Sequence, residues 1–139
     1  MTAVVERDVR FCMPELAWCW GRIQILMDNH PVRAVETVRS IERQRVLYSY
    51  GRDSASPIGV DEHHPLGRIV TNALPGSSLH SPNVLGLSNA MDFMFEGPEP
   101  WSLDHPWERV GIIAEALGLV WGGRWTSPRD LGHIQTKEG

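Results

Sequence analysis

The sequence predicts a single α+β domain in which helices pack on a small sheet. Segments 14–29 and 104–117 carry apolar residues at helical spacing. Segments 32–38 and 89–95 have the alternating or continuous apolar pattern of short strands. With 139 residues and 42% apolar content, the chain can bury one core and leaves little room for a second. We therefore expect one domain over residues 1–139.

The N-terminal part is predicted as helix, strand and helix. The helix over 14–29 starts at Pro14, a residue suited to a first turn. One face of this helix is apolar and consists of Leu16, Cys19, Trp20, Ile23 and Met27. The alternating segment 32–38 predicts a strand, and Ser40 resembles a cap that starts a second helix ending near Gly51.

The middle of the chain is predicted to be mostly irregular. Residues 52–68 lack periodicity and form a long loop, which in compact domains is often functional. A short strand at 69–74 and a turn at 75–78 follow. After an irregular stretch at 81–87, residues 89–95 predict a buried strand.

The C-terminal part contains one further helix. After the Pro-rich loop 96–103, this helix spans 104–117, with Pro106 in its first turn and Gly118 closing it. Beyond it, the tail that begins at Val120 has no assigned element.

Composition excludes several classes of protein. The chain has 13 basic and 17 acidic residues and only one lysine, so neither a nucleic-acid partner nor a basic membrane patch is expected. No apolar stretch reaches the length of a membrane span, and the first residues do not resemble a secretory signal. Cys12 and Cys19 are expected to be buried free thiols.

A small set of polar residues could carry chemistry. Asp92 interrupts an apolar strand, and a buried carboxylate must be paired or bind a metal. His80 precedes this strand, and His133 follows Asp130 by three residues. Two histidines and one carboxylate can form a catalytic zinc site, and a further carboxylate can act as general base. The alternative is an Asp92 that caps a turn and two unrelated surface histidines.

Four segments in a fixed order carry a family resemblance. They are RSIERQRVLYSYGR at 39–52, VTNALPGSSLH at 70–80, GLSNAMD at 86–92 and GLVWGGRWTSPRDLGH at 118–133. This order resembles the M15 family of zinc peptidases, which cut peptidoglycan peptides, over about residues 32–135. The resemblance implies an α+β fold of the Hedgehog/DD-peptidase type, with helices packed on an antiparallel sheet and zinc in the cleft.

The resemblance also implies roles for individual residues. His80, Asp92 and His133 would hold Zn²⁺, and Asp130 would be the catalytic base. Arg39 would hold the substrate carbonyl or the tetrahedral intermediate. Ser78 would contact the substrate, and Trp121 and Trp125 would shape the cleft floor. Because tryptophans more often belong to the core, Trp125 alone is expected to line the cleft.

Two departures from the family pattern are visible. About five residues, 81–85, are inserted between His80 and Asp92. A loop there can bulge outward without moving either ligand. The second departure is Gln135, which stands where the family often has Glu or His two residues after its last ligand; it can still orient a neighbour by hydrogen bonding.

The expected function is cleavage of the L-alanyl-D-glutamate bond of the stem peptide by a monomeric phage or prophage endolysin. Such a protein would be made in the bacterial cytoplasm and act on the wall after release. A carboxypeptidase acting on D-alanyl-D-alanine would need a cation for the substrate's terminal carboxylate. Arg39 is already assigned to the carbonyl, which leaves Arg124 among the motif arginines considered for this role. A non-catalytic zinc-fold binding or virion module and an unrelated small cytoplasmic domain remain as alternatives.

Overall fold

A computed structural model describes residues 5–40, 42–45, 79–126 and 129–137. The predicted loop at 52–68, strand at 69–74 and turn at 75–78, including Ser78, lie outside the described residues.

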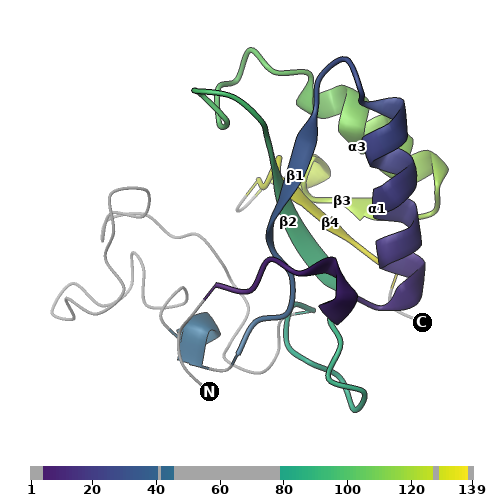
Figure 1. Ribbon diagram of the computed structural model, residues 1–139, viewed down its shortest axis with the longest axis vertical. Coiled ribbons are helices and arrows are strands. Elements are labelled where there is room, and N and C mark those ends of the chain that lie inside the picture. The colour runs from purple at the N-terminus through teal and green to yellow at the C-terminus, as the bar shows by residue number, and fades with distance from the viewer. Residues whose placement is uncertain (1–4, 41, 46–78, 127–128, 138–139) are drawn as a thin grey trace, which may run out of the picture.

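A four-stranded antiparallel sheet forms the centre of the molecule, which confirms the predicted α+β class (Figure 1). Its strands are β1 (Val32–Glu36), β2 (Ala90–Phe95), β3 (Val120–Trp121) and β4 (His133–Gln135). They lie in the order β1-β2-β4-β3, so the last strand of the chain is inserted beside β2. The sequence predicted β1 and β2, whereas β3 and β4 were not recognised because strands of two and three residues are too short for a period to show.

Two helices pack on the same side of this sheet (Figure 1). Helix α1 (Pro14–Leu26) begins at its proline, as predicted, and buries the apolar face that the spacing indicated. Helix α3 (Trp107–Ala116) begins after Pro106 rather than at residue 104. Gly118, with φ of +89°, follows its C-terminus in the left-handed conformation that glycine tolerates. Of the predicted second helix, residues 42–45 are described and are helical.

The two faces of the sheet have different roles. Met91, Phe93 and Phe95 of β2 belong to the core cluster under the helices. Because side chains alternate along a strand, Asp92 points to the opposite face. The same alternation puts Ile134 of β4 in the core and His133 on the face of Asp92.

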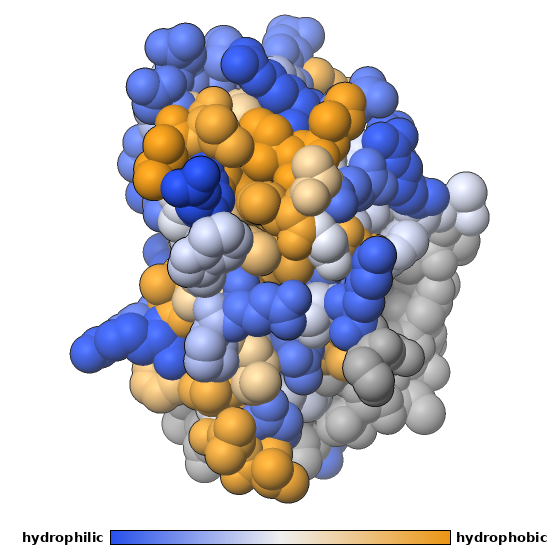
Figure 2. Space-filling model, turned by 90° about the vertical axis from the view of Figure 1, so that its right-hand side faces the viewer, coloured by the Kyte–Doolittle hydropathy of each residue, from blue (hydrophilic) through white to orange (hydrophobic). Residues whose placement is uncertain are grey.

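The helix side of the molecule is partly apolar at its surface (Figure 2). Leu26, Ile112 and Ile113 line a shallow hollow there, together with Glu108 and Arg109. No described helix is long and apolar enough to cross a membrane.

The loop that carries the five extra residues projects from the sheet (Figure 1). Asn83 closes it, because its Oδ1 accepts hydrogen bonds from the backbone N–H groups of Leu85 and Leu87 at 2.8 and 3.2 Å. Gly86 turns the chain with φ of +77°, and Val84 is fully exposed at the tip. The insertion therefore bulges outward, as the sequence analysis allowed.

Candidate metal centre

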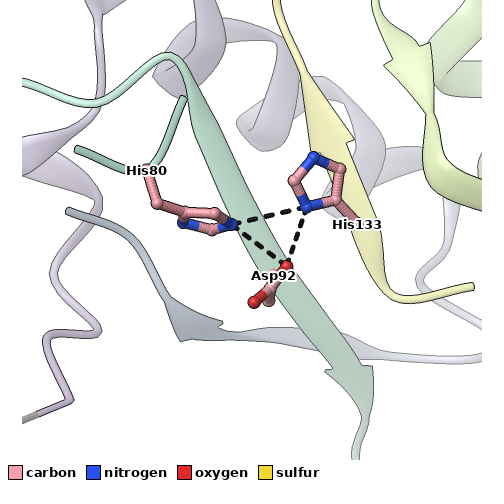
Figure 3. Close-up of side chains that lie close together, drawn as sticks. All are labelled: His80, Asp92 and His133. Atoms are coloured by element: carbon pink, nitrogen blue, oxygen red, sulfur yellow. Dashed lines mark hydrogen bonds and ion pairs between the residues drawn. The ribbon is translucent and has the colours of Figure 1, made fainter. Parts of the chain in front are cut away.

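The structure brings together His80, Asp92 and His133 on the sheet face opposite the helices (Figure 3). Asp92 lies in β2, and His133 is its cross-strand partner at the start of β4. His80 comes from the loop before β2, where its backbone carbonyl accepts a hydrogen bond from the N–H of Arg39 at 2.6 Å. Both histidines are buried, so the alternative of unrelated surface histidines is wrong.

The three side chains present one ligand atom each to a common point. The distances are 3.3 Å from His80 Nε2 to Asp92 Oδ1, 3.1 Å from His133 Nδ1 to the same oxygen, and 3.4 Å between the two nitrogens. A tetrahedral zinc ion with bonds of about 2.0–2.2 Å separates its ligands by about 3.3–3.6 Å. The triangle fits one face of such a tetrahedron with little adjustment.

Hydrogen bonds on the far side of each ring select the nitrogen that is left for a metal. His80 Nδ1 lies 2.7 Å from the carbonyl oxygen of Thr37, and His133 Nε2 lies 2.8 Å from Gln135 Oε1. Both partners are acceptors, so in a metal-loaded site each ring would donate its proton outward and offer the lone pair of its other nitrogen to the metal. The prediction that Gln135 orients a neighbour is thereby confirmed.

Charge in the cluster also suits a cation. Burial opposes ionisation of Asp92, but the two histidines outweigh it and hold the Asp92 pKa well below its usual value. Burial lowers the pKa of His80. Burial acts in the same direction on His133, but its hydrogen bond to Asp92 and the charges of Asp92 and Asp130 raise the His133 pKa overall. An ionised carboxylate between two rings is therefore the resting state at neutral pH.

Arg39 lies beside the cluster and contacts the carboxylate of Asp92. Its Nη2 is 3.2 Å from Asp92 Oδ2, the oxygen that does not face the histidines. Its other hydrogen bonds go to the side chains of Glu36 and Gln44, and it is buried. The structure thus puts Arg39 at the site, while its predicted contact with substrate stays a prediction.

Asp130 lies at the edge of the cluster, where it keeps 41% of its side chain exposed. Its Oδ2 is 3.9 Å from His133 Nδ1. Partial burial, followed by the negative charge of Asp92, raises the pKa of Asp130 to about 6. A carboxylate that is exposed on one side and titrates near neutrality is suited to exchange protons with a water or substrate.

Gly122 fixes the position of the segment that carries Asp130. Its carbonyl accepts the N–H of Asp130 at 3.0 Å, and a Cβ at Gly122 would lie 2.5 Å from the Asp130 carbonyl oxygen. The close approach of these two backbone segments therefore requires glycine.

The two motif tryptophans have different surroundings. The ring of Trp125 is half-buried, and its centroid lies 4.8 Å from that of His133, next to the candidate metal centre. The resemblance assigned Trp121 to the cleft floor, but the structure places it in the core, where tryptophans are more often found. Its ring is only 1% exposed, it lies against Gly111 and Gly123, and its Nε1 donates to the carbonyl of Leu131.

Sequence reasoning missed two contributors to the site. Glu36 is buried beside Asp92, and Thr37 supplies the carbonyl that orients His80. A carboxylate within an alternating strand was a signal for Glu36, like the one that identified Asp92. Thr37 acts through its backbone carbonyl, which every residue has. Its role therefore could not be predicted from the residue type.

Comparisons with known proteins agree with this geometry. The model of a D-alanyl-D-alanine carboxypeptidase family of the M15 type matches residues 77–136, a segment that contains all three candidate ligands and Asp130. The peptidoglycan L-alanyl-D-glutamate endopeptidase CwlK of Bacillus subtilis (strain 168) is 32% identical over 111 residues. This match covers 72% of the present chain and 57% of CwlK, so the chain spans just over half the length of that relative.

A solved structure supports the fold. The L-Ala D-Glu endopeptidase ChiX of Serratia marcescens superposes with a TM-score of 0.54 at 21% sequence identity, covering 94% of this chain and 84% of that one. This likeness concerns the fold alone, whereas the matched family segment and the curated relative show that the chain resembles the M15 peptidases.

Proposed function

We propose that the chain is a zinc-dependent peptidase that hydrolyses the L-alanyl-D-glutamate bond of the peptidoglycan stem peptide. We further propose that it serves as a phage or prophage endolysin, made in the host cytoplasm and acting on the wall after release. The observation that carries the proposal is the triangle of His80, Asp92 and His133, with Asp130 beside it. Two relatives whose names specify an L-Ala-D-Glu endopeptidase, CwlK and ChiX, support the choice of bond.

The chain's own residues account for binding and proton transfer. Bound zinc would supply the Lewis acid that polarises the scissile carbonyl and acidifies the attacking water. Asp130 accepts a proton from that water as it attacks the carbonyl carbon. Asp130 then gives the proton to the leaving nitrogen as the C–N bond breaks, which releases a carboxylate and an amine. The Asp130 pKa is raised to about 6 in the metal-free protein, and a bound cation would lower it, so Asp130 is ionised and able to accept the proton at neutral pH.

Two further residues are proposed to act on the substrate. Trp125, beside His133, offers an apolar surface for the stem peptide. Arg39 contributes positive charge from beside Asp92 while negative charge develops on the carbonyl oxygen.

The charges around the site favour an endopeptidase over a carboxypeptidase. Arg39 is hydrogen-bonded to Glu36, Gln44 and Asp92, and Arg124 is paired with Glu115 at 3.0 Å. Arg39 and Arg124, the two motif arginines considered above, are thus both paired within the protein. The carboxypeptidase reaction remains the second candidate because the matching family model is described by it.

The test is mass spectrometry of purified peptidoglycan digested with the zinc-loaded protein. Stem fragments with a new N-terminal D-Glu, and L-Ala left on the glycan, are expected. Release of free D-Ala from otherwise intact stems would replace the endopeptidase by the carboxypeptidase. A protein that binds one zinc but cuts neither bond would be a non-catalytic module.

A further inference from the structure

We infer that Glu36 is a positioning residue of the metal centre. It holds the guanidinium of Arg39, which in turn orients the Asp92 carboxylate so that Oδ1 faces the two histidines. This inference rests on the proposed zinc site and adds a residue that lies outside the family motifs quoted above.

Glu36 belongs to a row of side chains across three strands. Glu36 of β1 is the cross-strand partner of Asp92 in β2, and Asp92 is the partner of His133 in β4. The register of β1 shifts between Ala34 and Glu36, and such an irregularity re-aims the residues that follow it. Two carboxylates directly opposite each other repel, so this pair needs a cation between them.

Arg39 is that cation, and Glu36 fixes its orientation. Glu36 is 3% exposed, and its Oε1 accepts hydrogen bonds from Arg39 Nε at 3.1 Å and Nη2 at 2.9 Å. Gln44 Oε1 accepts from Arg39 Nη1 at 2.8 Å on another edge. The guanidinium is therefore held from two sides before it reaches Asp92.

The fixed guanidinium determines which oxygen of Asp92 is available to a metal. Arg39 Nη2 binds Asp92 Oδ2 at 3.2 Å, whereas Oδ1 lies 3.1–3.3 Å from the histidine nitrogens. If Glu36 no longer held Arg39, the carboxylate could rotate and lose this division of its oxygens. Outer partners that orient metal ligands typically contribute about 10- to 100-fold in metal affinity.

Glu36 could affect zinc binding through its negative charge alone, without positioning Arg39, and the two effects must be distinguished. Glu36 also accepts a hydrogen bond from Arg43 Nε at 3.1 Å through Oε2, so Glu36 and Asp92 balance Arg39 and Arg43. Glu36→Gln adds one net positive charge, which alone would weaken cation binding. The double variant Glu36→Gln/Arg43→Gln restores the wild-type net charge but still lacks the ion pair that holds Arg39.

The experiment is competition for Zn²⁺ between the full-length protein and a chromogenic chelator. Wild type, Glu36→Gln, the double variant and the exposed control Glu108→Gln are compared, and the melting temperature of each metal-free protein is recorded. Glu36→Gln and the double variant should bind zinc about 10- to 100-fold more weakly. The control should match the wild type, because the Glu108 side chain is 71% exposed on the helix side. The visible spectrum of the Co²⁺-loaded proteins should show altered ligand geometry in the two weakened variants only.

The outcomes separate this inference from the proposed function. Wild-type affinity in Glu36→Gln overturns the inference and leaves the zinc site standing, as does full recovery in the double variant. A lower melting temperature with unchanged affinity also overturns it, because Glu36 would then only support the fold. If the wild type binds no zinc, both proposals fail.

Should Glu36→Gln not fold, Glu36→Asp retains the charge but withdraws the oxygens by about 1.5 Å. It should still weaken zinc binding, and unchanged affinity there contradicts the inference.

Discussion

Replacing Asp130 by Asn should make the metal-free protein more stable at neutral pH while nearly abolishing its activity. The Asp130 pKa is raised to about 6 in the folded protein, from an ordinary value of 3.8. A carboxyl whose pKa is raised by folding destabilises the folded state while it is ionised. This penalty is full above about pH 6 and disappears as the pH falls toward 3.8. Asn keeps the shape and removes the charge.

The activity should change in the opposite direction. Loss of a positioned general base costs roughly 10²- to 10⁴-fold in rate, which corresponds to about 2.7–5.5 kcal/mol in the activation barrier. The three ligands are untouched, so zinc content should stay at one per chain. A bound cation lowers the pKa of a neighbouring carboxyl, so the acidic limb of the wild-type pH–rate profile should lie below about pH 6.

Two measurements on the same samples test this reasoning. Thermal melts in a metal chelator are recorded at several values between pH 4 and pH 7. The melting temperature of Asp130→Asn should exceed that of the wild type only at the upper end of this range. Turnover of purified peptidoglycan at pH 7 gives the loss of activity. Asp104→Asn, at an exposed position before α3, serves as the matched control and should change neither. Near-normal turnover by Asp130→Asn would refute the assignment of Asp130 as the base.

Two further substitutions test the surroundings of the site. Gln135→Leu leaves the buried N–H of His133 without an acceptor, which costs about 1–3 kcal/mol and should weaken zinc binding about 5- to 150-fold in a chelator titration. Unchanged affinity would show that Gln135 does not select the ring nitrogen. Gly122→Ala would place a Cβ 2.5 Å from the Asp130 carbonyl oxygen, and denaturant melts should show a loss of about 1–3 kcal/mol. Gly21→Ala, in α1 with open space around it, should be neutral or slightly stabilising.

The sequence predicted those parts of the fold that depend on local periodicity. The apolar face of α1 and the strands β1 and β2 follow from residue spacing, and the structure confirms them. Strands β3 and β4 are too short to show a period, and pairing with distant residues holds them in place. The strand pattern was therefore incomplete where it depended on long-range contacts.

The sequence allowed the three candidate ligands to be predicted. The hydrogen bonds and ion pairs that surround these ligands were less predictable. Asp92 stood out because a carboxylate within an apolar strand needs a partner, and the family motifs supplied His80 and His133. The pairing of Glu36 with Asp92 follows a register shift in β1, which no residue spacing reveals. Trp121 belongs to a family motif but is buried against two glycines, so its place in the motif did not reveal its surroundings.

The most direct test of the central claim is anomalous diffraction at the zinc edge from crystals grown with one equivalent of Zn²⁺. The account predicts one strong peak about 2.0–2.2 Å from His80 Nε2, Asp92 Oδ1 and His133 Nδ1, with the fourth position open to water. A peak elsewhere would contradict it, as would a zinc ion bound through the opposite nitrogen of either histidine or an empty triangle at saturating zinc.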